Sequence, residues 1–192
     1  MLRLSRRRLL QLAASGSAAL AAGGSRSGEC DEPLPGLKFA ICNETFRDWP
    51  DERAFAFAAE CGYQGIEIAP FTIANDVRHV TGAQRTRIRR LAEKHGLEIC
   101  GLHWLLAKTK GLHLTSPDPS IRRATAEYLA ELTRFCSDLG GQVMIFGSPQ
   151  QRNLPDGVDR KQGMEHASEV FEAVLPTLEQ TRITLALEPL GP

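Results

Sequence analysis

Short apolar runs alternate with longer amphipathic stretches along the whole chain after residue 36. The runs lack the strict alternation of a half-exposed strand, as is typical of parallel strands covered on both faces. These predicted strands lie at residues 37–43, 65–70, 97–104, 142–149 and 183–187. The stretches between them repeat their apolar positions with a helical period. They predict helices at residues 50–62, 84–95, 119–139 and 161–180.

Residues that start and stop helices support these boundaries. Pro50 precedes two acidic residues, and Gly62 closes the same stretch. Asp118 is a favoured N-cap, and Pro119 fits the first helical position. Gly96 is a favoured residue just beyond a helix end. The local signals and the apolar periodicity therefore predict the same elements.

The alternation of strands and helices predicts an α/β fold with a parallel sheet and right-handed crossovers. Strand starts are separated by roughly 28 to 45 residues, which is typical of a (β/α)₈ TIM barrel. A doubly wound sheet would normally carry a glycine-rich phosphate turn after its first strand. The segment "CNETFRDWP" follows that strand instead, so the barrel is favoured. Five strands cannot close it, and we expect residues 37–192 to be about five of the eight βα units of a longer protein.

The N-terminal segment has the layout of an export signal. It has a basic start, an apolar, alanine-rich middle at residues 9–22 and small residues after it. The run "SRRRLLQ" resembles a twin-arginine signal, which predicts a leader at residues 1–28, a linker at 29–36 and a periplasmic location. An N-terminal amphipathic or membrane-anchoring helix remains the alternative. The apolar middle is shorter than the ~20 residues of a spanning helix, so no stable membrane span is expected after cleavage.

The distribution of charge and the number of cysteines bear on which partners and which kinds of site are expected. The formal net charge is zero, but the first 28 residues hold five arginines and no acid, which leaves 18 basic and 23 acidic residues elsewhere. A negative body argues against a nucleic-acid partner. The five cysteines are odd in number and lack metal-type spacing. We expect Cys42, Cys61, Cys100 and Cys136 to be small buried apolar residues.

Polar residues stand at the predicted C-terminal ends of the strands, where a barrel builds its active site. They are Asn43, Glu44, Glu67, His103, Trp104, Ser148, Arg152 and Glu188. No nucleophile elbow, CxxC pair or HExxH motif occurs. Carboxylates with a histidine suit a divalent ion that prefers oxygen ligands, such as Mn²⁺ or Mg²⁺.

Several of these residues have two interpretations. Glu188 at a strand tip is costly unless it is metal-bound or paired with an arginine in a structural salt bridge. Glu67 could contact substrate or donors inside the barrel. His103 is either a core histidine or a contact to substrate or metal, and Trp104 follows it. Arg152 could hold a phosphate or sugar hydroxyl, or lie in a solvated loop.

The segments "AECGYQGIEIAPF", "GLHWLL", "DLGGQVMIFGSPQQR" and "TLALEPLGP" resemble the sugar phosphate isomerase/epimerase family, which has a xylose isomerase-like barrel. The resemblance covers residues 37–192. It implies a divalent metal (Mn²⁺, Mg²⁺, Co²⁺ or Zn²⁺) held by a Glu, an Asp, a His and a second Glu. Glu188 matches the first, as both metal ligand and acid/base. The other three would lie on later strands, so the resemblance predicts that this chain alone lacks a complete site.

The resemblance implies an isomerase or epimerase that moves a proton next to the carbonyl of a small keto-sugar or polyol. Glu67, His103, Trp104, Ser148 and Arg152 are then the predicted substrate-binding residues. A homo-oligomer is left open for the full-length protein. One alternative is a non-catalytic sugar-binding barrel. Another is an endonuclease IV-like metal-dependent phosphodiesterase, which His103 would suit but the histidine-free strand end "FGSP" would not.

Overall fold

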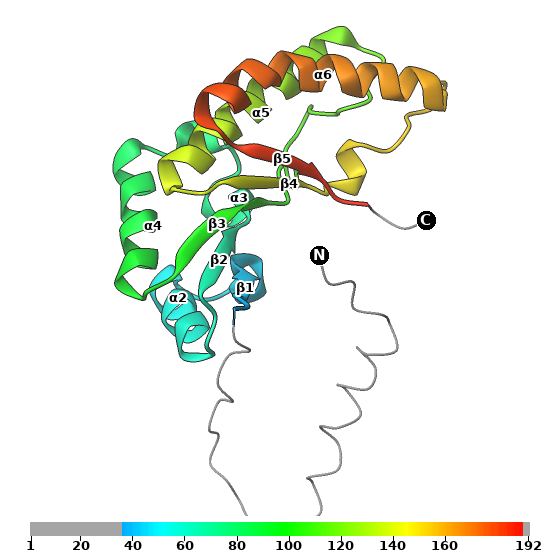
Figure 1. Cartoon of the computed structure of the whole chain (residues 1–192). Helices are drawn as coiled ribbons and strands as arrows, with labels where there is room; N and C mark the ends of the chain where they lie inside the picture. The colour runs from blue at the N-terminus through cyan, green and yellow to red at the C-terminus, as the bar shows by residue number, and fades with distance from the viewer. Residues whose placement is uncertain (1–35, 190–192) are drawn as a thin grey trace, which may run out of the picture. The chain divides into compact units, whose positions relative to one another are not determined.

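The sheet contains five parallel strands that neighbour one another in chain order (Figure 1). The computed structural model describes residues 36–189. Its strands are β1 (Ala40–Cys42), β2 (Gly65–Ile68), β3 (Glu98–His103), β4 (Val143–Phe146) and β5 (Thr184–Leu187). Each strand pairs in parallel with the next. The predicted parallel α/β fold is confirmed, with five strands in barrel order.

Four long helices connect the strands, as the periodicity predicts. They are α2 (Asp51–Glu60), α4 (Gly82–Lys94), α5 (Pro119–Leu139) and α6 (Arg160–Thr181). Figure 1 shows α4, α5 and α6 following one another along the outer side of the sheet. Four short elements were not predicted: η1 (Asn43–Phe46), α3 (Pro70–Ile73), η2 (Val77–His79) and η3 (Pro149–Gln151). Three of them, η1, α3 and η3, begin within three residues of the end of a strand and shape the rim where the candidate site lies.

Side-chain caps fix the starts of the long helices. Thr81 and Gln84 form a capping box at the start of α4, in which each side chain accepts a hydrogen bond from the backbone amide of the other residue. Asp159 and Gln162 form an equivalent capping box at the start of α6. Asp118 accepts a hydrogen bond from the Ser120 amide of α5. Because these caps satisfy amides that have no partner within the helix, the sequence determines where each helix begins.

The two faces of the sheet differ in chemistry. On the helix-covered face, the side chains of β2, β3 and β4 are buried, among them Ile66, Ile68, Leu102, Met144 and Phe146. Leu187 shares this face on the edge strand β5 but is 57% exposed. Neighbouring positions along each strand point the other way, which leaves Glu67 and His103 on the opposite face. Between β3 and β4, a Cβ atom on Gly101 would collide with the backbone of Val143. Glycine is therefore required there for the two strands to pair.

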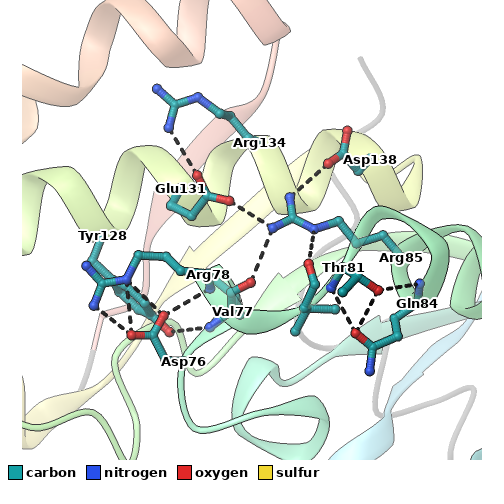
Figure 2. Close-up of polar contacts among 11 residues, drawn as sticks. Asp76, Val77, Arg78, Thr81, Gln84, Arg85, Tyr128, Glu131, Arg134 and Asp138 are labelled. Atoms are coloured by element: carbon teal, nitrogen blue, oxygen red, sulfur yellow. Dashed lines mark hydrogen bonds and ion pairs between the residues drawn. The ribbon is translucent and has the colours of Figure 1, made fainter.

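A polar network joins η2, α4 and α5 (Figure 2). The guanidinium of Arg85 donates to the carbonyls of Val77 and Val80, at 3.2 and 3.0 Å. It also contacts the carboxylates of Glu131 and Asp138, each at 2.8 Å. Since its side chain is only 11% exposed, this arginine ties the loop after α3 to both helices.

Several expectations need correction. The first strand begins at Ala40 rather than residue 37, and its residues are exposed or half-buried because β1 lies at an edge of the described sheet. Of the four cysteines expected to be buried, only Cys136 is, whereas Cys61 is exposed. Cys61 lies at the C-terminal cap of α2, facing solvent rather than the sheet.

The predicted leader lies outside the described residues, and so does the linker up to residue 35. Within the described part of the chain, no helix is both long and apolar enough to cross a membrane.

Candidate functional site

Parallel pairing places Glu67 and His103 on one face at the C-terminal ends of their strands. Glu67 lies opposite Gly101, after a register irregularity between Ile66 and Glu67. His103 lies two residues beyond Gly101, so it points to the same face as Glu67. Glu188 follows β5 directly, and its amide donates to the carbonyl of Phe146 at 3.2 Å. Three predicted site residues thus converge from three strands.

His103 is the centre of this group. Its Nδ1 lies 3.3 Å from Glu67 Oε2, and its Nε2 lies 3.6 Å from Glu188 Oε2. The hydrogen bond with Glu67 is the main cause that raises the pKa of His103, and the charges of both carboxylates add to it, while burial acts against it. The imidazole is therefore a proton-holding bridge between two carboxylates that are about a quarter and a third exposed.

Gly147 makes the approach of Glu188 possible. A Cβ atom at this position would overlap Glu188 Oε2 and come within 4.0 Å of His103 Nε2. Because glycine has no side chain, the Glu188 carboxylate leans across the end of β4 to reach the imidazole. The sequence places both residues at strand ends but contains no direct sign of this contact.

Cys42 is a member of the group that sequence reasoning did not include. It is the register partner of Glu67, so the two side chains share a face. The thiol sulfur, a Glu67 carboxylate oxygen and a His103 ring nitrogen lie within 4.8 Å of one another. Burial raises the pKa of Cys42 to about 11, so its thiol is neutral in the metal-free chain at pH 7. Its place near the end of the first predicted strand was the signal available in the sequence.

Trp104 and Ser148 lie beside this cluster in unusual backbone conformations. Trp104 has φ 57°, and its ring stacks on His103 with a centroid separation of 5.8 Å. Ser148 has φ 40°, and its buried Oγ accepts a hydrogen bond from the Leu106 amide at 3.0 Å. Residues other than glycine rarely adopt positive φ, and such strain tends to gather at functional sites.

Arg152 holds the ends of β4 and β5 together. Its guanidinium donates to the carbonyl of Phe146 at 3.2 Å and to that of Glu188 at 2.6 Å. Both acceptors are backbone groups, so the residue positions the strand that carries Glu188. Its predicted contact with substrate stays a prediction.

Asn43 has a structural contact. Its Oδ1 accepts from the Ala69 amide at 2.8 Å, and its Nδ2 donates to Thr72 Oγ1 at 2.7 Å. These bonds tie the end of β1 to the loop after β2. The residue stabilises the rim on which the site stands.

A cavity of about 350 Å³ opens at the same rim. Its lining includes two predicted residues, Trp104 and Ser148, together with Glu44. Arg47, Phe71 and Lys108 also line it and were not predicted, because they lie on the loops and short helices that the sequence pattern did not reveal. A volume of this size suits a small molecule such as a monosaccharide.

The electrostatics of the site favour a cation. Among residues 36–189, no lysine or arginine forms an ion pair with Glu67 or Glu188, and His103 is the ionisable partner of both. Two carboxylates that share one imidazole leave excess negative charge. Carboxylate and imidazole groups are ordinary ligands of divalent ions, so the residues present fit a metal.

Comparison with known proteins agrees with the predicted barrel fold. Residues 55–192 match the family described as xylose isomerase-like TIM barrel. A probable ketose 3-epimerase from Synechocystis sp. is 27% identical over 142 residues, which are 73% of this chain and 46% of that protein.

Two solved structures share the fold. D-psicose 3-epimerase from Clostridium cellulolyticum superposes with a TM-score of 0.66 at 18% identity, over 81% of this chain and 53% of that one. The 3-keto-D-glucoside 4-epimerase from E. coli gives 0.61 at 13% identity, over 81% and 57%. The chain thus spans about half the length of these relatives. With a match that covers residues 55–192, the chain belongs to the xylose isomerase-like TIM barrel family.

Proposed function

We propose that this protein is a divalent-metal-dependent sugar isomerase or epimerase that transfers a proton at the carbon next to the carbonyl of a small keto-sugar or polyol. The observation that carries the proposal is the Glu188 carboxylate at the C-terminal end of β5, held against His103 and without a lysine or arginine partner within residues 36–189. The relatives named as sugar epimerases support this choice of reaction.

Glu188 is the group that moves the proton. Its carboxylate is 37% exposed and faces the rim of the sheet, where a substrate carbon can approach it. A carboxylate there acts as a general base that removes the proton. Epimerisation then requires a second acid to return a proton to the opposite face of the carbon, and the family resemblance places that group, a second Glu, on a later strand. His103 orients this carboxylate through Nε2, and Arg152 fixes the backbone that carries it.

A divalent ion held in part by Glu188 would supply Lewis-acid polarisation of the substrate carbonyl. The chain itself supplies the binding surface beside it. Trp104 and Phe71 give the rim cavity aromatic faces, and Ser148 adds a polar group. Glu67, His103, Trp104, Ser148 and Arg152 are retained as the residues proposed to contact the carbohydrate.

The proposed place of action is the periplasm. This part of the proposal is supported only by the sequence of residues 1–28, which resembles a twin-arginine leader. An exported enzyme would meet extracellular or periplasmic carbohydrate.

The test is an epimerisation assay on the protein as its source cell makes it. Ketohexoses such as D-psicose and D-fructose are supplied, and product epimers are measured after chelation and after return of Mn²⁺ or Co²⁺. We expect chelation to abolish turnover and the metal to restore it. Glu188→Gln should reduce kcat by at least roughly a hundredfold, because it removes the general base.

Glu172→Gln is the matched control, since Glu172 lies on α6 away from the rim. It should keep wild-type activity. Full activity in Glu188→Gln, or activity that chelation does not change, would contradict the proposal.

A further inference from the structure

The Cys42, Glu67 and His103 side chains bring three different ligand atoms to one point at the ends of β1, β2 and β3. These strands lie side by side in the sheet (Figure 1). The three atoms lie within 4.8 Å of one another, and all three residues are half-buried. We propose that they form a second cation site, for one borderline-soft divalent ion such as Zn²⁺, with the Cys42 thiolate, a Glu67 oxygen and His103 Nδ1 as ligands.

The spacing fits a tetrahedral ion. A nitrogen and an oxygen that are each about 2.1 Å from a shared tetrahedral zinc ion are separated by about 3.4 Å. His103 Nδ1 and Glu67 Oε2 are 3.3 Å apart, which is long for a hydrogen bond and close to that separation. In such a site the sulfur would lie about 3.6 Å from each of the other ligands. In the structure it lies within 4.8 Å of both, so an adjustment of the Cys42 side chain completes the site.

The other nitrogen of His103 supports this assignment. When Nδ1 binds a metal, Nε2 carries the ring proton and donates it to an acceptor, which is most often a carboxylate or carbonyl. Glu188 Oε2 occupies that place, 3.6 Å from Nε2. The carboxylate that orients the imidazole is therefore already present.

The chemical type of the three ligands determines which divalent ion the site would prefer. A thiolate is a soft ligand that favours Zn²⁺ or Co²⁺ over Mg²⁺ and Mn²⁺. Three protein ligands leave a fourth position open, the arrangement of zinc ions that bind water or substrate. Glu188 is not a ligand of this site, and the presence of the site does not depend on the proposed reaction.

Cobalt spectroscopy tests the site in the protein as its source cell makes it. Metal-free reduced protein is titrated with Co²⁺, and the near-ultraviolet thiolate-to-cobalt charge-transfer band is followed. We expect a band that saturates as Co²⁺ is added and disappears in Cys42→Ser. His103→Gln and Glu67→Gln should weaken cobalt binding at this site by roughly tenfold or more.

Cys61→Ser is the matched control, because it removes an exposed thiol at the end of α2. It should leave the band unchanged. Circular dichroism of each variant separates loss of a ligand from loss of the fold, and Glu67→Gln keeps side-chain size if Cys42→Ser is unstable. No band in the wild-type protein, or a band that persists in folded Cys42→Ser, would overturn the proposal.

Glu188→Gln distinguishes this site from the proposed enzyme activity. Glu188 is not a ligand of this site and glutamine has the same size, so the cobalt–thiolate band should remain while epimerisation is lost. Wild-type protein that epimerises ketoses but shows no cobalt–thiolate band would instead remove the second site and leave the enzyme assignment standing.

Discussion

Single atoms decide the geometry around Glu188. The Glu188 carboxylate reaches His103 because Gly147 has no side chain to block it. The guanidinium of Arg152 donates a hydrogen bond to the backbone carbonyl of Glu188 and so holds that residue in place. The Trp104 ring stacks on the face of the His103 imidazole and limits its movement. The position of the proposed base is thus set by three neighbours, none of which has to touch the reacting carbon.

Gly147→Ala tests this positioning. The new methyl group would overlap Glu188 Oε2 and push the carboxylate away from His103. We expect kcat to fall at least roughly tenfold with little change in melting temperature, because small misplacements of a catalytic group are costly. The measurement is epimer formation together with thermal unfolding.

Gly82→Ala serves as the comparison, since a Cβ atom at Gly82 would meet no atom within 4 Å. It should retain full activity. Wild-type kcat in Gly147→Ala would show that the Glu188–Gly147 contact is irrelevant to turnover.

Among the secondary-structure elements, η2 depends on one cap. The Asp76 side chain accepts a hydrogen bond from the Arg78 amide at 2.9 Å and pairs with the Arg78 guanidinium (Figure 2). The hydrogen bond from the Arg78 side chain is the main cause that lowers the pKa of Asp76 below its usual value. The contact links the start of η2 to the face of Tyr128 on α5 through the same guanidinium.

This shift predicts a pH dependence of stability. A carboxyl with a lowered folded-state pKa stabilises the fold above its unfolded pKa of about 3.9, and this contribution is lost as pH falls through the folded pKa. We expect Asp76→Asn to lower the free energy of unfolding at pH 7 by less than about 1 kcal/mol, because Arg78 is largely exposed. The difference from wild type should vanish at lower pH.

Urea unfolding at a series of pH values measures this difference, with Asp156→Asn as control because Asp156 is exposed in a loop. A gap between wild type and Asp76→Asn that is constant from pH 7 to pH 2 would contradict the assigned cause.

The sequence predicts long elements well and their short connections poorly. The helix predicted from Asp118 and Pro119 to Leu139 matches α5, because its cap, its apolar stripe and its glycine stop agree. Short segments such as η1 and α3 hold too few residues for a period to be visible. The positive φ values of Trp104 and Ser148 are imposed by tertiary contacts that no local pattern records.

The same limit applies to the site. Glu67, His103 and Glu188 were predictable because parallel strands present their C-terminal ends at one edge. The inclusion of Cys42 required the register of β1 against β2, and the contact through Gly147 required side-chain packing. Arg152 was predicted as a substrate contact, but its bonds to two carbonyls appear only in three dimensions.

For the whole molecule, the sheet and its site belong to a barrel family, and the matched part of this chain covers about half the length of the relatives compared with it. Within residues 36–189, β1 and β5 are the two edge strands, and Glu188 stands at the end of the β5 edge. A TIM barrel closes with eight strands and places its reactive groups at their C-terminal ends. The described residues therefore place the proposed base at the end of the barrel where this family of folds performs its chemistry.

The most direct test of the central claim is solvent deuterium incorporation into a ketose, followed by proton NMR. The native protein is incubated with metal and D-psicose or D-fructose in D₂O, alongside Glu188→Gln. If Glu188 transfers the proton, deuterium should appear at the carbon next to the carbonyl with wild-type protein and not with the variant. Equal incorporation by both proteins, or epimer formation without deuterium uptake, would contradict the assignment of Glu188 as the acid/base group.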